Sequence, residues 1–212
     1  MSDAPAKTVV FDLGGVLVDW DPRYLYRTLM PSEAEVERFL TEVATPEWNA
    51  AQDVGRTWAE AVETLSGQFP EHADLIAAYD ERWLETIRGD IPGTVEILGQ
   101  LRAAGTPLYA LTNWSAEKFP LARERFGWLA WFEGIVVSGE EQVVKPDPRI
   151  YRILLDRHGL DPAATVFIDD SRPNVDAAAA VGITALHFTS PEGLRDDLDG
   201  LGFTLDDREI SA

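Results

Sequence analysis

Cysteine is absent from this chain of 212 residues, and basic residues are scarce beside acidic ones. Without cysteine, the chain cannot form disulfides, use a thiol nucleophile or bind zinc through thiolates. It has 18 Lys and Arg residues against 37 Asp and Glu residues, which gives a formal net charge of −19. Such an acidic surface repels phosphate backbones and anionic lipids, so neither a nucleic acid nor a membrane is an expected partner.

Long apolar runs are also missing. No stretch approaches the roughly 18 apolar residues of a membrane span, and residues 1–7 contain no apolar segment typical of a secretion signal. We therefore expect a cytoplasmic protein. The hydrophobic fraction of 45% is that of a globular chain. The length allows one domain with a large insertion, or two small domains.

The hydrophobic pattern divides the chain into two kinds of segment. Residues 22–89 contain no convincing strand, and helix starts are marked by Ser32 and Thr57, each followed three residues later by a glutamate. Apolar residues at helical spacing predict a further helix over residues 71–88. From residue 91 to residue 187, short apolar strands alternate with helices, which indicates parallel βαβ units.

Acidic side chains follow two of the predicted strands. Residues 8–11 form a β-branched and aromatic run that ends on Asp12, and the strand over residues 164–168 ends on Asp169 and Asp170. In open α/β sheets, ligands bind beyond the carboxyl ends of the strands. Because Mg²⁺ takes oxygen ligands from a few carboxylates, the two acidic strand ends predict a hard-cation site.

Four short motifs in this order resemble those of the haloacid dehalogenase-like hydrolase superfamily. They are the nucleophile strand end Phe11-Asp12-Leu13-Gly14-Gly15-Val16-Leu17, the strand end Leu111-Thr112-Asn113, the lysine segment Val144-Lys145-Pro146-Asp147-Pro148, and the acidic pair Phe167-Ile168-Asp169-Asp170-Ser171. The resemblance covers the whole chain. It implies an α/β fold with a Rossmann-like parallel sheet, helices on both faces, and an inserted helical cap. The core would comprise residues 1–19 and 90–212, and the cap residues 20–89.

The resemblance also implies a magnesium-dependent phosphatase acting on a small phosphorylated metabolite through an aspartyl-phosphate on Asp12. The implied catalytic residues are Asp12, Thr112 and Lys145. Phosphate would be bound by Gly14, Gly15, Thr112, Asn113 and Lys145. Mg²⁺ would be held by Asp12, the carbonyl of Gly14 and Asp170, with Asp169 acting through water. Asn174 could orient Lys145 or Asp170.

One position departs from the family pattern. Most phosphatases of this superfamily carry a second aspartate two residues after the nucleophile, as general acid and base, and this chain has Gly14 there. Three explanations remain open: a substrate with a good leaving group, proton transfer by a cap group or by Asp19 or Asp21, or chemistry that needs no proton. The third corresponds to a metal-free 2-haloacid dehalogenase, against which the acidic pair argues. A phosphate-binding module that has lost catalysis is a further alternative.

Several aromatic and basic residues near the motifs could contact substrate. The turn Asp53-Val54-Gly55-Arg56 lies between Trp48 and Trp58 and could reach the mouth of the active site, although core packing explains these tryptophans equally well. Trp20 and Trp114 follow the first two motifs and could line the crevice, whereas Trp83 is predicted to pack in the core. Arg23 and Arg56 are candidates for holding a substrate anion, although a solvated arginine on a helix or loop explains each of them better. Neither the substrate nor the oligomeric state follows from these motifs.

Overall fold

A five-stranded parallel sheet forms the centre of the larger part of the molecule. The computed structural model describes residues 7–205. The strands lie in the order β5-β4-β1-β6-β7, so that β1 pairs with β4 on one side and β6 on the other, with Phe11 opposite Ala110 and Ile168. The strand bounds are Thr8–Phe11 (β1), Leu108–Thr112 (β4), Gly134–Val137 (β5), Thr165–Asp169 (β6) and Thr184–His187 (β7).

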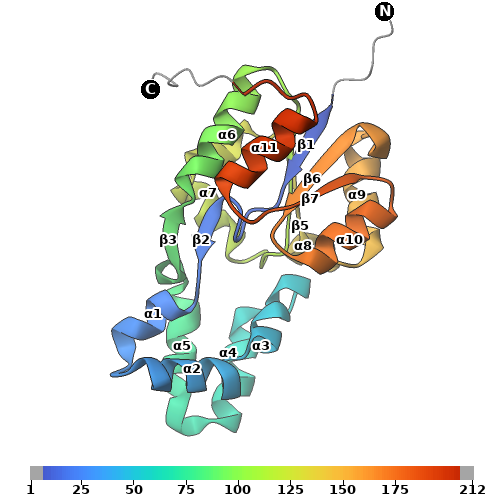
Figure 1. Ribbon diagram of the computed structural model, residues 1–212. Coiled ribbons are helices and arrows are strands. Elements are labelled where there is room, and N and C mark those ends of the chain that lie inside the picture. Colours follow the sequence, from blue (N-terminus) through green and yellow to red (C-terminus); the bar gives the residue numbers. More distant parts are fainter. Residues whose placement is uncertain (1–6, 206–212) are drawn as a thin grey trace, which may run out of the picture.

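Helices cover both faces of this sheet (Figure 1). Alternate residues of a strand point to opposite faces, and Val9 and Phe11 accordingly belong to a different apolar cluster from Val10. The first cluster includes residues of α6 (Pro92–Ala103), α7 (Phe119–Arg125) and α11 (Pro191–Gly200), and the second includes residues of α9 (Pro148–His158) and α10 (Arg172–Ala180). The predicted fold class, an α/β protein with a Rossmann-like parallel sheet, is confirmed.

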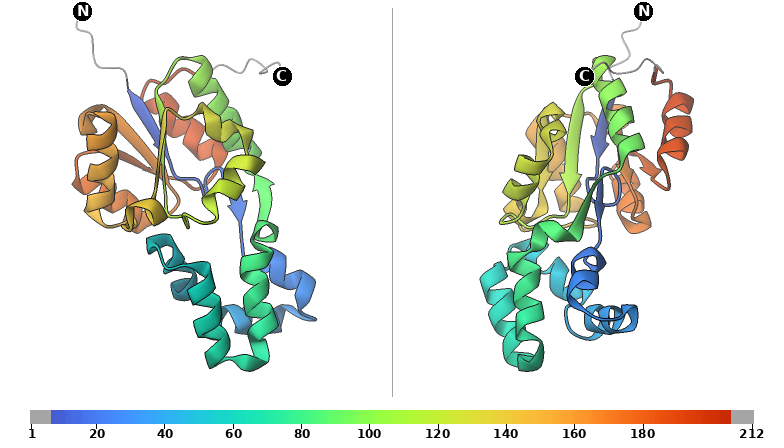
Figure 2. Two further views of the ribbon diagram at one scale, coloured as in Figure 1. Left: turned by 180° about the vertical axis from the view of Figure 1, so that it is seen from behind. Right: turned by 90° about the vertical axis from the view of Figure 1, so that its left-hand side faces the viewer.

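A helical insertion lies beyond the carboxyl ends of the strands (Figures 1 and 2). Both predicted cap signals operate: the Ser32 hydroxyl accepts a hydrogen bond from the amide of Glu35, and Thr57 forms a reciprocal capping box with Glu60. The insertion comprises α1 (Arg23–Leu29), α2 (Glu33–Glu42), α3 (Pro46–Ala50), α4 (Trp58–Gln68) and α5 (Ala73–Glu81), with 3₁₀ turns η1 (Gln52–Val54), η2 (Pro70–His72) and η3 (Trp83–Thr86).

A two-stranded antiparallel ribbon joins the insertion to the sheet, which the sequence did not predict. Its strands are β2 (Val18–Trp20) and β3 (Ile87–Asp90). We predicted a helix through Arg88, but α5 ends at Glu81 and is followed by η3 and the strand. Ile87 continues the helical spacing of the preceding apolar residues, so the local pattern favours a helix. The pairing with β2, about 70 residues away in sequence, overrides that preference.

The insertion contacts the core directly as well as through the ribbon. The indole Nε1 of Trp58 donates to the hydroxyl of Ser115 over 3.1 Å, and the Trp58 amide donates to the Glu117 carboxylate over 3.1 Å. Lys118 donates to the carbonyl of Asp80 over 2.9 Å and pairs with its carboxylate. These contacts hold α4 and α5 against the core. Within residues 7–205, no helix combines the length and the apolar character needed to cross a bilayer.

Candidate active site

The predicted site residues gather at the carboxyl edge of the sheet. Asp12 directly follows β1, while Thr112 and Asp169 are the last residues of β4 and β6. Since β4, β1 and β6 are adjacent and parallel, their ends lie side by side. The fourth motif residue, Lys145, reaches the same point from the segment between α8 (Ser138–Glu141) and α9.

Lys145 joins two of the carboxylates. Its Nζ lies 2.9 Å from Oδ1 of Asp12 and 2.6 Å from Oδ2 of Asp169, and the side chains of Lys145 and Asp169 are both 0% exposed. Burial disfavours the ammonium ion, but the two carboxylates outweigh it and hold the pKa of Lys145 above its usual range. The Leu13 amide also donates to Oδ1 of Asp12 over 2.7 Å. Within residues 7–205, the polar contacts of the Asp12 side chain therefore all involve Oδ1, and Oδ2 has none.

Two asparagines fix this arrangement. The Asn113 side chain accepts from the Lys145 amide over 2.8 Å and donates to the Lys145 carbonyl over 3.0 Å, so it holds the backbone of the lysine. Asn174, which we expected beside Lys145 or Asp170, instead donates to Oδ1 of Asp169 over 3.0 Å. The amide of Ser171 donates to the same oxygen over 2.8 Å. Both oxygens of Asp169 are thus engaged, and Oδ2 pairs with Lys145.

Thr112 is buried, and its hydroxyl has no hydrogen-bond partner within residues 7–205. Leaving a buried hydroxyl unpaired costs about 1–3 kcal/mol, so such groups in native structures usually serve a ligand or an ordered water. The hydroxyl lies at the same sheet edge as Asp12. It is therefore available to donate to an anionic ligand held there.

Three carboxylates are close enough to share a cation. One oxygen each from Asp12, Asp169 and Asp170 lies within 4.8 Å of the others. Burial raises the pKa of Asp12; Lys145 opposes this shift and Asp169 adds to it. A further positive charge near Asp12 would therefore stabilise its carboxylate. Gly15 makes the approach of Asp170 possible: its φ is 74°, and a Cβ there would lie 2.4 Å from Oδ2 of Asp170. The donor set fits a hard divalent cation.

Comparison with known proteins agrees with this arrangement. The sequence profile described as haloacid dehalogenase-like hydrolase matches residues 6–182. The chain belongs to the haloacid dehalogenase-like hydrolases. It is 30% identical over 183 residues to the sesquiterpene phosphatase astK of Aspergillus oryzae, covering 86% of this chain and 90% of that one. It is 26% identical over 206 residues to the phosphoglycolate phosphatase of Escherichia coli O157:H7, covering 86% and 81%.

Solved structures share the fold of this hydrolase. A predicted HAD-like family hydrolase from Porphyromonas gingivalis superposes with a TM-score of 0.73 at 20% identity, covering 93% of this chain and 98% of that one. A HAD family enzyme of Bacteroides thetaiotaomicron, in complex with magnesium and inorganic phosphate, gives a TM-score of 0.68 at 21% identity and covers 88% and 95%. The resemblance stated from the four motifs is confirmed, and the chain is a hydrolase.

A cavity of about 100 Å³ opens between the insertion and the sheet edge of the hydrolase. Gly14, Asn113 and Ser115 line it from the core side, and Asp53 lines it from η1. Its remaining wall is largely aromatic, because four tryptophans also face it: Trp20, Trp58, Trp83 and Trp114. The expectations that Trp20 and Trp114 line the crevice are confirmed, whereas Trp83 both packs in the core and faces the cavity.

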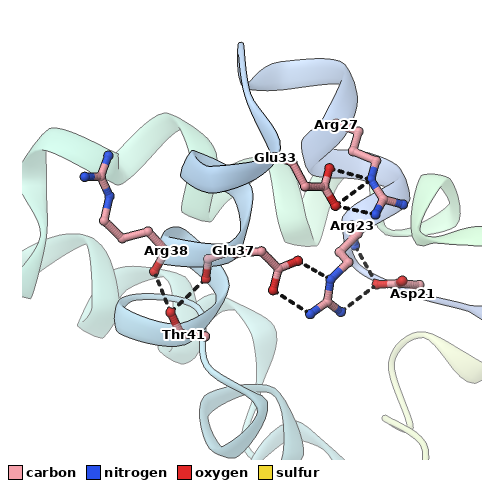
Figure 3. Close-up of polar contacts among 7 residues, drawn as sticks. All are labelled: Asp21, Arg23, Arg27, Glu33, Glu37, Arg38 and Thr41. Atoms are coloured by element: carbon pink, nitrogen blue, oxygen red, sulfur yellow. Dashed lines mark hydrogen bonds and ion pairs between the residues drawn. The ribbon is translucent and has the colours of Figure 1, made fainter.

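The basic residues proposed from the sequence are engaged elsewhere. Arg23 lies between Glu37 and Asp21, with Nη2 donating to Glu37 over 2.8 Å, as Figure 3 shows. Arg56 donates to Oε1 of Gln52 over 2.6 Å and also binds the carbonyl of Trp48. Neither arginine lines the cavity, and among residues 7–205 no lysine or arginine lines it. Trp48 packs edge-on against Trp58 with a centroid distance of 5.8 Å, behind the cavity wall.

Proposed function

We propose that this hydrolase is a magnesium-dependent phosphatase that cleaves a small phosphate monoester through an aspartyl-phosphate on Asp12. The observation that carries the proposal is the convergence of Asp12, Lys145 and the acidic pair beside the unpaired hydroxyl of Thr112. Similarity to two phosphatases supports it. We further propose that residues 20–89 act as a cap domain, which places a substrate between the sheet edge and η1.

The chain's own residues account for the phosphoryl-transfer step. Oδ2 of Asp12, free of other contacts, attacks phosphorus while Lys145 and the Leu13 amide hold Oδ1. Lys145 and the Thr112 hydroxyl then face the phosphoryl oxygens and stabilise the charge that develops on them. Asp169 keeps Lys145 in place. Water afterwards attacks the acyl phosphate and restores Asp12.

Magnesium would be held by Asp12, the Gly14 carbonyl and Asp170, with Asp169 acting through water. When bound, the ion would offset repulsion between the carboxylate nucleophile and the phosphate and would stabilise the negative charge of the transition state. A related fold that binds magnesium and inorganic phosphate supports this assignment. Asp170 fits the role because Gly15 allows its carboxylate to approach the loop after β1.

We also propose that the organic part of the substrate is neutral and apolar. In the part of the chain that the structure describes, four tryptophans line the cavity and no basic side chain lines it to pair with a second anionic group. A buried carboxylate without a charged partner is costly to desolvate, which disfavours substrates such as phosphoglycolate. An apolar group gains from contact with the indole rings. Among the two relatives, the sesquiterpene phosphatase agrees with this chemistry better than the phosphoglycolate phosphatase.

Phosphate release tests the proposal. Purified protein is assayed with p-nitrophenyl phosphate, prenyl and aryl phosphates, and phosphoglycolate, with magnesium and with a chelator. We expect turnover of the apolar esters that the chelator removes and that Asp12→Asn abolishes. Halide release from 2-chloropropionate without metal would instead support the dehalogenase alternative, and binding without turnover across the whole panel would support the inactive module.

A further inference from the structure

The proposed phosphatase chemistry needs a proton that Gly14 cannot supply. When the ester bond breaks, the leaving oxygen of an alkyl phosphate departs as a poor alkoxide unless an acid protonates it. Two residues after Asp12, where the family usually has that acid, the glycine has no side chain. A lack of space does not explain the glycine at this position, because a Cβ built on Gly14 would meet no atom within 4 Å. For an alkyl ester, an acid would therefore have to come from another residue that faces the same cavity.

Two of the aspartates considered from the sequence are already engaged. Oδ1 of Asp19 accepts a hydrogen bond from the Tyr24 hydroxyl over 2.7 Å. Oδ1 of Asp21 accepts from the amide of Arg23 over 2.9 Å and pairs with its guanidinium. Neither is among the residues lining the cavity. Proton transfer from these two positions is therefore disfavoured.

Asp53 is placed differently. It lies in η1, which packs against α8 of the core, and it lines the cavity together with Gly14 and Asn113. Within residues 7–205, no hydrogen bond or ion pair reaches its carboxylate. Asp53 is thus a partly buried acid without a partner, which faces the cavity that Gly14 also lines and is close enough to Lys145 for that charge to act on it. Such a placement is typical of a group that exchanges protons with a ligand.

We propose that Asp53 is the general acid and base of this enzyme, delivered by the insertion in place of the acid missing at position 14. The inference rests on the proposed phosphatase function. In the first step, Asp12 forms a bond to phosphorus, the ester P–O bond breaks, and the carboxyl proton of Asp53 passes to the leaving oxygen. In the second step, the Asp53 carboxylate takes a proton from water as that water attacks phosphorus, and the bond from phosphorus to Asp12 breaks. Alcohol and inorganic phosphate are released, and both aspartates return to their starting states.

The surroundings of Asp53 keep its proton available near neutral pH. Burial raises the pKa of Asp53 to about 7, and Lys145 is the charge that opposes this shift. Tyr79 of α5 also interacts with Asp53, and its own pKa lies well above its usual range, so it stays neutral and adds no charge. A group with a pKa near the working pH can serve as acid in one step and base in the next.

The test compares two classes of ester in the wild type and in Asp53→Asn. The ratio kcat/KM reports the steps through release of the alcohol. For an alkyl ester such as 2-phenylethyl phosphate, which needs protonation, we expect kcat/KM to fall by about 10²–10⁴-fold. For p-nitrophenyl phosphate, whose leaving group needs no proton, we expect kcat/KM to change by less than about fivefold. A purely structural role would lower both values by the same factor.

A second variant distinguishes the loss of the acid from damage to the fold. Because a Cβ built at position 14 would meet no atom within 4 Å, Gly14→Asp in the Asp53→Asn background should raise kcat/KM for the alkyl ester at least tenfold above that of Asp53→Asn alone. Asp74→Asn, an exposed change on α5 of the insertion, is the matched control and should leave both esters unaffected. Equal loss on both esters, or no loss on either, would overturn the role of Asp53. A wild type without activity on any ester would instead overturn the proposed function.

Discussion

The carboxylate of Asp53 should make the folded protein less stable at high pH, and Asp53→Asn should remove that cost. In a solvated chain the pKa of an aspartate is about 3.8, and in the folded protein burial raises that of Asp53 to about 7. Each pKa unit corresponds to 1.36 kcal/mol, so the penalty on the ionised form reaches about 4 kcal/mol. Since the side chain keeps some contact with solvent, we expect a cost of about 2–4 kcal/mol.

The raised pKa of Asp53 determines how the free energy of unfolding changes with pH. Below about pH 4 the carboxyl is protonated in both the folded and the unfolded state, so the penalty is absent. Between pH 4 and pH 7 the unfolded chain loses its proton while the folded protein keeps it, and the penalty grows. Above pH 7 it is constant. Asparagine does not titrate, so the advantage of Asp53→Asn in free energy of unfolding grows over the same interval.

Urea unfolding at pH 5 and pH 8, in chelator so that metal binding does not contribute, measures the effect. We expect Asp53→Asn to be more stable than the wild type by about 2–4 kcal/mol at pH 8 and by about 1–2 kcal/mol at pH 5. Asp156→Asn, at an exposed position of α9, is the control and should change stability by less than about 0.5 kcal/mol at both pH values. The same advantage at both pH values, or a less stable variant at pH 8, would refute the reasoning.

Three further predictions concern the nucleophile, the metal and the cavity. Lys145→Met leaves two buried carboxylates without their cation and should lower the free energy of unfolding in chelator by about 3–5 kcal/mol, a value that urea titration at pH 8 checks. Gly15→Ala should raise the magnesium concentration needed for half-maximal activity at least tenfold by displacing Asp170, whereas Gly105→Ala, with a similar φ and open space, should not. Trp20→Ala should raise KM for a prenyl phosphate at least tenfold and leave KM for methyl phosphate within threefold, and an unchanged prenyl value would show that the indole does not contact the substrate.

The parallel sheet could be predicted from the sequence because it depends on local patterns, whereas the four motif residues stand out only through their order along the chain and the family resemblance. Uninterrupted apolar runs such as residues 8–11 and 108–111 mark strands buried on both faces, and a polar residue after each marks the carboxyl edge. The ribbon formed by β2 and β3 could not be predicted in this way. Its strands are short, and only their pairing with each other, across the whole insertion, distinguishes Ile87–Asp90 from the end of a helix.

The role of the cap residues depends on tertiary placement in the same way. The turn containing Asp53 was recognised as a candidate to reach the active site, but its burial arises only when η1 packs against α8. Likewise, Arg56 became an internal partner of Gln52 rather than a substrate ligand, because the 3₁₀ turn brings the two side chains together. The sequence pattern alone does not distinguish an arginine that binds its own backbone from one that binds an anion.

The residues of the candidate site come from two parts of the chain, the core around the sheet and the insertion. Asp12 follows a central strand and Lys145 comes from the loop before α9, both in the core, whereas Asp53, Trp58 and Trp83 come from the insertion. Under the two proposals above, replacing the insertion would change the preference for the organic group and the source of the proton together, and would leave Asp12 and Lys145 in place. An insertion that took its place would then have to bring its own acid.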